Sequence, residues 1–241
     1  MDRLSAPALT GPALTGIRRL SALDTVRARI ALAVELGLLA PGEPLPPGPE
    51  IAVALGVGEI TVRRALESLC FAGVLERRRG RGGGTLVAPE PAMGVVAEIA
   101  AYTGGAAEMH ELIDHRLALE TGLVHLAAVS RDDLAVAELR DLVSLMDKAS
   151  GWAEFHELDA RFHLAVVEAS GLAVGVGRYA AVVRELYRYY LPYPMEYLHE
   201  SNREHGELVT AIERRDAVAA VAVICRHVEV LHSTMLSRHS R

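Results

Sequence analysis

The chain has 241 residues, of which 51% are hydrophobic, and a formal net charge of −6. This length is enough for two modest domains that each bury a core. No apolar stretch approaches about 18 residues without a charge, and no charged start precedes a long apolar segment. We therefore expect no membrane span, no signal peptide and a cytoplasmic location.

The charge is unevenly distributed along the chain. Residues 1–88 contain 11 basic and 8 acidic residues, whereas residues 89–241 contain 14 basic and 23 acidic residues. A basic N-terminal segment followed by an acidic C-terminal segment is typical of a nucleic-acid-binding domain joined to a regulatory domain. The basic surplus is small here.

The first 88 residues divide into a tail and a small helical domain. Residues 1–19 are expected to form a disordered tail, because they contain no periodic apolar pattern. In residues 20–88, the spacing of apolar residues predicts helices over 23–36, 50–55 and 60–72 and strands over 74–77 and 84–87. Residues 89–94 are rich in Pro and small residues, which predicts a linker.

The second and third predicted helices have the spacing of a helix-turn-helix. Gly56 suits the turn between them, and Val62, Leu66 and Leu69 give the later helix an inward face. Its outward face and the Arg/Gly-rich turn between the strands offer side chains to DNA: Glu59, Thr61, Arg63, Arg64, Arg79 and Arg81. The alternative is an ordinary helical hairpin with a solvated basic turn, which the combination of spacing and wing disfavours.

Residues 95–238 contain no strand pattern and are expected to form an antiparallel helical bundle. Helices are predicted near 107–129, 132–149, 152–170, 173–191, 195–214 and 216–237, with a further short candidate near 94–102. The fold class is therefore mainly α, with a winged helix-turn-helix followed by a helical domain.

Four ionisable residues of this second domain lie in the middle of apolar helix stripes: Asp159, His163, His205 and His227. A carboxylate that faces a core is costly unless something compensates it. Each residue alone is more often a satisfied core group than a ligand. All four on inward faces of three helices favour a divalent metal site, and the donor set suits zinc, nickel, cobalt or manganese.

Arg116 also lies in the middle of an apolar stripe, with Glu120 one turn later on the same face. One interpretation is a buried ion pair that stabilises the bundle. The other is a guanidinium that binds a carboxylate ligand while the metal binds the same ligand. The nearby tyrosines could line such a pocket or simply pack: Tyr187, Tyr189, Tyr190, Tyr193 and Tyr197.

The order of these motifs over two domains resembles the GntR family of bacterial transcription regulators, with the all-helical FCD domain of its FadR subfamily. The N-terminal resemblance lies in Pro41-Gly42-x-x-Leu45-Pro46, Leu55-Gly56-Val57, Val62-Arg63-x-Ala65-Leu66-x-x-Leu69 and Gly73-Val74-Leu75-Glu76-Arg77-Arg78. The C-terminal resemblance lies in Arg116-Leu-Ala-Leu-Glu120, Asp159-x-x-Phe162-His163, Glu204-His205 and Arg226-His227.

Together these motifs extend over about residues 20–237. The resemblance implies metal ligands at the four ionisable positions, an effector contact at Arg116, and DNA contacts that include the wing glycine Gly82.

The chain departs from the family pattern around the recognition helix. The family usually has Leu-Pro-Ser-Glu-Arg where this chain has Leu45-Pro46-Pro47-Gly48-Pro49, and Val-Ser-Arg where it has Val57-Gly58-Glu59. Pro47, Pro49, Gly58 and Glu59 therefore replace residues that the resemblance would assign to DNA contact. Glu59 adds a negative charge close to DNA, so we expect weaker or redirected binding.

These observations favour a transcription regulator, repressor or activator, and not an enzyme. We expect a homodimer, because one winged helix covers a half-site and an inverted repeat needs two. The expected partners are double-stranded operator DNA and a small organic acid. The alternatives are a metal-dependent hydrolase that uses the three histidines and Asp159, and a regulator that senses the metal itself.

Overall fold

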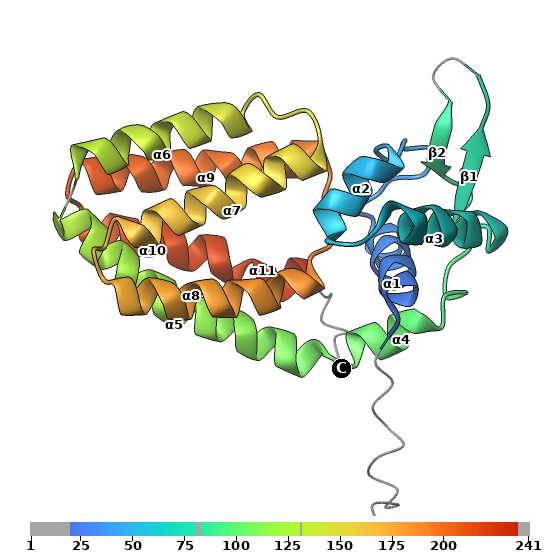
Figure 1. The fold of residues 1–241 in the computed structure, drawn as a ribbon, viewed down its shortest axis with the longest axis horizontal. Coiled ribbons are helices and arrows are strands. Elements are labelled where there is room, and N and C mark those ends of the chain that lie inside the picture. The colour runs from blue at the N-terminus through green and yellow to red at the C-terminus, as the bar shows by residue number, and fades with distance from the viewer. Residues whose placement is uncertain (1–19, 81–82, 131, 236–241) are drawn as a thin grey trace, which may run out of the picture.

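The computed structural model describes residues 20–80, 83–130 and 132–235. Figure 1 shows a helical bundle at one end and a smaller winged domain at the other. The elements in chain order are α1 (Ala22–Glu35), α2 (Gly48–Leu55), α3 (Glu59–Phe71), β1 (Leu75–Arg78), β2 (Gly84–Val87), α4 (Glu98–Thr103), α5 (Ala106–Ser130), α6 (Asp133–Met146), α7 (Trp152–Glu168), α8 (Ala173–Leu186), η2 (Tyr187–Tyr189), α9 (Met195–Glu213), α10 (Ala217–Glu229) and α11 (Leu231–Thr234).

The first part is a winged helix-turn-helix. Ser21 caps α1 by accepting a hydrogen bond from the Asp24 amide. Gly56 ends α2 with a φ of 64°, which allows the sharp turn into α3. β1 and β2 form an antiparallel pair with Leu75 opposite Val87. The predicted fold class, winged helix followed by a helical domain, is confirmed.

Two helix ends differ most from the sequence-based expectation. The last long helix was expected over 216–237, but α10 ends at Glu229 and α11 follows after Val230. The helix expected over 173–191 ends at Leu186 and continues as the short 3-10 turn η2. Pro192 accounts for the non-helical backbone at Leu191, because a proline disfavours helical backbone in the residue before it.

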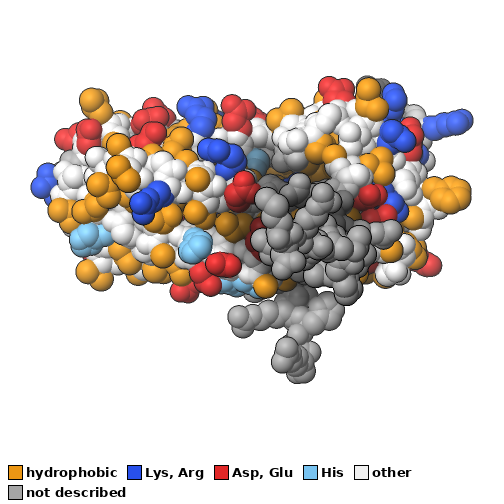
Figure 2. Space-filling model, turned by 60° about the horizontal axis from the view of Figure 1, so that its bottom comes forward, with side chains coloured by type: hydrophobic (Ala, Val, Ile, Leu, Met, Phe, Trp, Pro, Cys, Tyr) orange, Lys and Arg blue, Asp and Glu red, His pale blue; other side chains and the backbone are white. Residues whose placement is uncertain are grey.

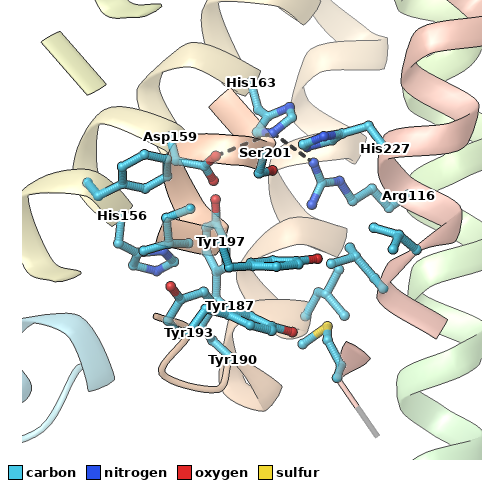
Figure 3. Close-up of a pocket in the computed structure, with 16 residues that line it drawn as sticks. Arg116, His156, Asp159, His163, Tyr187, Tyr190, Tyr193, Tyr197, Ser201 and His227 are labelled. Atoms are coloured by element: carbon cyan, nitrogen blue, oxygen red, sulfur yellow. Dashed lines mark hydrogen bonds and ion pairs between the residues drawn. The ribbon is translucent and has the colours of Figure 1, made fainter. Parts of the chain in front are cut away.

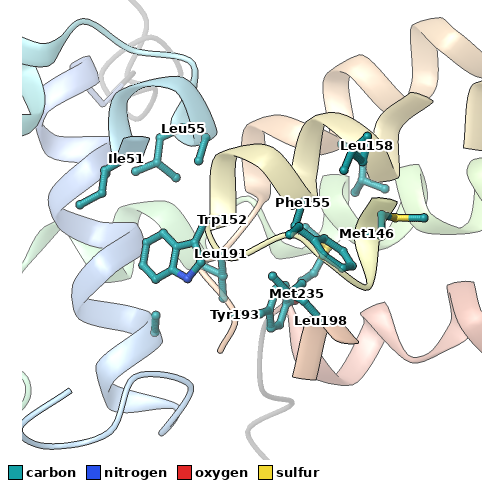
Figure 4. Packing of buried hydrophobic residues seen from close by; sticks show 14 of the residues in the cluster. Ile51, Leu55, Met146, Trp152, Phe155, Leu158, Leu191, Tyr193, Leu198 and Met235 are labelled. Atoms are coloured by element: carbon teal, nitrogen blue, oxygen red, sulfur yellow. The ribbon is translucent and has the colours of Figure 1, made fainter. Parts of the chain in front are cut away.

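The two domains share one continuous apolar core. Trp152 at the start of α7 is buried, and Figure 4 shows its indole beside Leu191 and facing Ile51 and Leu55 of α2. On the same side, Arg29 of α1 donates a hydrogen bond through Nε to the Tyr190 carbonyl. The winged domain is therefore packed directly against the helix that carries Asp159 and His163.

One stretch, Ala217–Thr234, is long and apolar enough by composition to cross a membrane. Ala220, Val223, Ile224 and His227 of this stretch are buried against the rest of the bundle. A core helix of a helical bundle meets the same criterion, so this stretch carries little weight as a membrane segment.

Candidate functional site

Three histidines from three helices meet inside the bundle. His163 of α7, His205 of α9 and His227 of α10 are all buried, and each offers a ring nitrogen within 4.8 Å of the others. We call these three residues the histidine cluster. Sequence periodicity predicted that each would face inward, and the structure brings them together.

Each imidazole of the cluster is oriented by a hydrogen bond at Nδ1. The acceptors are side-chain oxygens: Glu120 Oε1 for His163 (2.7 Å), Asn202 Oδ1 for His205 (3.1 Å) and Glu204 Oε2 for His227 (2.9 Å). The Asn202 amide is oriented in turn, because its Nδ2 donates to the Val143 carbonyl and to Asp147. Since carboxylate and amide oxygens only accept, each Nδ1 carries a proton, and in the neutral imidazole Nε2 then keeps the lone pair.

The Nε2 atoms converge without a donor among themselves. His205 Nε2 lies 3.3 Å from His227 Nε2. Burial, together with His227 and His163 beside it, lowers the pKa of His205 well below its usual value, and burial also lowers the pKa of His227. Neutral imidazoles with facing lone pairs are unfavourable alone and are the form that binds metal. The donor set therefore fits a divalent cation.

Asp159 lies at the edge of the cluster. Its Oδ1 is 3.7 Å from His163 Nε2 and 3.6 Å from His205 Nε2, and its side chain is 21% exposed. Two ligands that are each about 2.1 Å from one ion lie roughly 3 to 3.5 Å apart. The carboxylate is thus close to a position where it could share an ion with the imidazoles.

Arg116 connects Glu120 to the cluster. Its Nε donates to Glu120 Oε2 at 2.8 Å, and its Nη2 lies 3.1 Å from His163 Nε2. Burial alone would lower the pKa of Arg116, but the Glu120 carboxylate together with Tyr179 and Tyr187 outweighs burial and raises it. Arg116 therefore forms the buried ion pair with Glu120, and its guanidinium also faces His163.

A cavity of about 70 Å³ lies beside the cluster, and Figure 3 shows its labelled lining. Arg116, Asp159, His163 and His227 form its polar end. Four of the five tyrosines line the cavity: Tyr187, Tyr190, Tyr193 and Tyr197. The hydroxyls of Tyr187 and Tyr190 are buried without a hydrogen-bond partner among the described residues. Tyr189 instead donates to Glu108, away from this cavity.

The residues expected to contact DNA lie on the winged domain. Arg63 and Arg64 project from the solvent face of α3, and Thr61 is half-buried beside them. Arg79 is exposed after β1, while Arg81 and Gly82 lie outside the described residues. Figure 2 shows basic side chains projecting at the end of the molecule where the winged domain lies.

The residues that depart from the family pattern border the same surface. A groove between α3 and the wing is lined by Pro47, Pro49 and Glu59 together with Arg63 and Arg79. Glu59 occupies the first turn of α3, where no side chain caps the helix. Its carboxylate therefore lies among the basic side chains that a phosphate would approach.

Sequence reasoning missed three residues that orient the histidines. Glu120 entered the sequence analysis only as a possible ion-pair partner of Arg116, and Asn202 and Glu204 were given no role at the site. Asn202 is one helical turn before His205, so the spacing alone could have indicated a contact. Glu204 reaches His227 on another helix, which helical periodicity cannot reveal.

Comparisons with known proteins agree with this architecture. Residues 22–86 match the model of the gntR family of bacterial regulatory proteins, and residues 111–230 match the FCD domain. RmpR of Mycobacterium gastri, assigned as an HTH-type transcriptional regulator, is 29% identical over 85% of this chain and 77% of its own length.

Two further comparisons cover most of the chain. The Uxu operon transcriptional regulator of Escherichia coli K12 is 27% identical over 81% of this chain and 79% of its own length. Among solved structures, E. coli McbR/YncC has a TM-score of 0.47 and 20% identity, over 90% of this chain and 97% of that one.

The winged helix and the helical domain define a ligand-responsive, DNA-binding transcription regulator. The chain belongs to the GntR family and carries a C-terminal FCD domain. This membership does not favour the hydrolase alternative.

Proposed function

We propose that this regulator binds one divalent ion through Asp159 and the histidine cluster. The observation that carries the proposal is the convergence of three Nε2 lone pairs whose opposite nitrogens are all held by acceptors. Zinc, nickel, cobalt and manganese are the candidates, because three imidazoles and one carboxylate suit all four. The ion would supply a positive charge at the end of the cavity and an attachment point for a ligand oxygen.

The proposed effector is a small organic acid that contacts the ion and Arg116. Arg116 Nη2 faces the cluster and lines the cavity, so a carboxylate could accept from it while another oxygen approaches the ion. The unpartnered hydroxyls of Tyr187 and Tyr190 would give the remaining polar atoms of the ligand a partner.

The proposed output is binding of an operator by a cytoplasmic homodimer. The DNA contacts assigned to each chain are Thr61, Arg63, Arg64, Arg79, Arg81 and Gly82. Two winged domains would read the two halves of an inverted repeat. The effector changes operator affinity only if it binds the two arrangements of the winged domains with different affinity.

The route for this effect is the contact between the domains. Asp159 and His163 lie on α7, and Trp152 at the start of the same helix packs against α2 of the winged domain. A ligand that moves α7 relative to α5 and α9 would move the surface on which α2 rests.

Calorimetric titration of metal-loaded protein with di- and hydroxycarboxylates tests the effector site. Binding should disappear after chelation and weaken at least about tenfold in Arg116→Ala, the loss of one charge-assisted pair. Arg203→Ala is the control, because Arg203 pairs with Glu200 on the exposed side of α9. Acids that still bind after chelation and in Arg116→Ala would place the effector elsewhere.

A further inference from the structure

A second cleft lies where the winged domain meets the start of the helical domain. Its volume is about 590 Å³, and it is bounded by α1, the end of α2, α4 and the start of α5. It shares no lining residue with the cavity beside the histidine cluster. The proposed metal and effector site therefore gives this cleft no role.

Among the lining residues is Arg29, whose buried guanidinium has no counterion in the part of the chain that the structure describes. Arg29 is 3% exposed, and no carboxylate pairs with it in residues 20–80, 83–130 and 132–235. Its Nε donates to the Tyr190 carbonyl, but its buried Nη2 has no hydrogen-bond partner there. A buried charge without compensation is costly, and an arginine cannot escape that cost by losing its proton at ordinary pH.

A second unpartnered donor lies beside this guanidinium. The hydroxyl of Tyr102 on α4 is buried and has no hydrogen-bond partner among the described residues. Burial raises the pKa of Tyr102 to about 12, while Arg29 acts in the opposite direction. Tyr102 therefore keeps its proton and can donate a hydrogen bond. Because this hydroxyl and Arg29 Nη2 are both buried, an acceptor must enter below the surface of the cleft to reach them.

We propose that this cleft binds a small aliphatic monocarboxylate, held by Arg29 Nη2 and the Tyr102 hydroxyl. A carboxylate accepts hydrogen bonds from both donors and neutralises the guanidinium. Leu55 and Val57 line the cleft and provide an apolar surface for a short hydrocarbon chain. Glu108 lines it too, and its negative charge opposes anion binding, so a ligand with one carboxylate is favoured over a ligand with two.

Such a ligand would connect the two domains. Arg29 belongs to α1 of the winged domain, whereas Tyr102 belongs to α4 at the entrance to the helical domain. Occupancy would fix the winged domain against α4 independently of any metal. The cleft would then be a second regulatory input beside the proposed effector cavity.

Binding of acetate, butyrate and hexanoate to the full chain tests the proposal. Thermal-shift and calorimetric measurements at constant ionic strength, with chloride as reference, should show saturable binding that tightens about fourfold per methylene. The effect should survive chelation and Arg116→Ala, whereas binding at the histidine cluster would not. Equal stabilisation by sulfate, or none above chloride, would overturn the proposal.

Variants of the two donors complete the test. Arg29→Met should weaken hexanoate binding at least about tenfold. Arg27→Met on the same helix should not, because Arg27 pairs with Glu98. If Arg29→Met does not fold, Tyr102→Phe removes one hydroxyl and should weaken binding about fivefold. Unchanged affinity in Tyr102→Phe and in a folded Arg29→Met would show that the acid binds elsewhere.

Discussion

At the scale of single residues, the site depends on which ring nitrogen carries the proton. Glu120, Asn202 and Glu204 each accept from an Nδ1, and this directs the three Nε2 lone pairs to one point. The contact of Arg116 with His163 Nε2 agrees with a proton on His163 Nδ1, because a guanidinium can only donate and Nε2 must therefore accept. Metal affinity should therefore depend on the acceptors as well as on the histidines.

Removal of one imidazole should abolish most metal binding. His205→Ala should lower bound metal from near one ion per chain to a small fraction, measured by elemental analysis of protein purified without chelator or a metal column. It should also remove metal-linked stability, about 2.7 kcal/mol at a metal concentration 100 times the Kd. His199→Ala is the control on the same helix, because His199 bonds the Ala149 carbonyl instead. Equal metal content in wild type and His205→Ala would contradict the site.

Loss of one orienting acceptor should weaken the metal without removing a ligand. Glu204→Ala leaves His227 Nδ1 without its partner and should weaken metal affinity about 10- to 100-fold, measured by competition with a chromophoric chelator. Glu207→Ala is the matched control, because Glu207 contacts Arg226 but not His227. If both variants bind metal equally well, the orientation of His227 does not matter.

At the scale of elements, α3 has the buried face of a helix-turn-helix recognition helix but carries an acidic residue, Glu59, in its first turn. Its inward face, Val62, Ala65, Leu66 and Leu69, is fully packed, so the recognition helix is held in place. Glu59 at its start borders the groove that also contains Arg63 and Arg79. The packing of the DNA-binding domain is thus intact, whereas the charge at the start of its recognition helix differs from the family pattern.

Reversal of the charge at Glu59 should strengthen DNA binding. Glu59→Arg should tighten affinity for a selected operator severalfold. The slope of the logarithm of the binding constant against the logarithm of the salt concentration should become steeper by about one. Glu67→Arg makes the same charge change on the exposed face of α3, farther from its start, and should have a smaller effect. Fluorescence anisotropy over a salt series would measure both, and equal gains would indicate a general charge effect.

At the scale of the whole molecule, the two domains are joined by more than the chain between them. Trp152 packs against α2, Arg29 bonds the Tyr190 carbonyl, and the apolar core continues from one domain into the other. Tyr190 also lines the cavity beside the histidine cluster. A change at that cavity therefore has direct contacts through which it can reach the winged domain.

Truncation of the interface tryptophan should uncouple the domains. Trp152→Ala should cost about 3 to 5 kcal/mol of unfolding free energy and should reduce the effect of an effector on operator affinity. Leu139→Ala is the control, because Leu139 is fully buried in α6 and should destabilise comparably without touching α2. Denaturant titration and DNA titration with and without effector would measure the two effects. Unchanged effector response in Trp152→Ala would exclude this route.

The sequence by itself determined the features that depend on local periodicity. The 3.6-residue repeat placed His163, His205 and His227 on inward faces, and glycine and proline marked most helix ends. Together with motif order, this was enough for the fold class and the family. It also placed Asp159 next to the site, although its side chain is partly exposed and lies at the edge of the cluster.

Only the tertiary structure decided which inward faces meet. The contact of Glu204 with His227, the docking of Trp152 on α2 and the position of Arg29 in an interdomain cleft join segments far apart in the chain. Helical periodicity fixes the direction of a side chain around its own axis, but not which helix it faces. That choice follows from how the helices pack, and packing is a property of the whole chain.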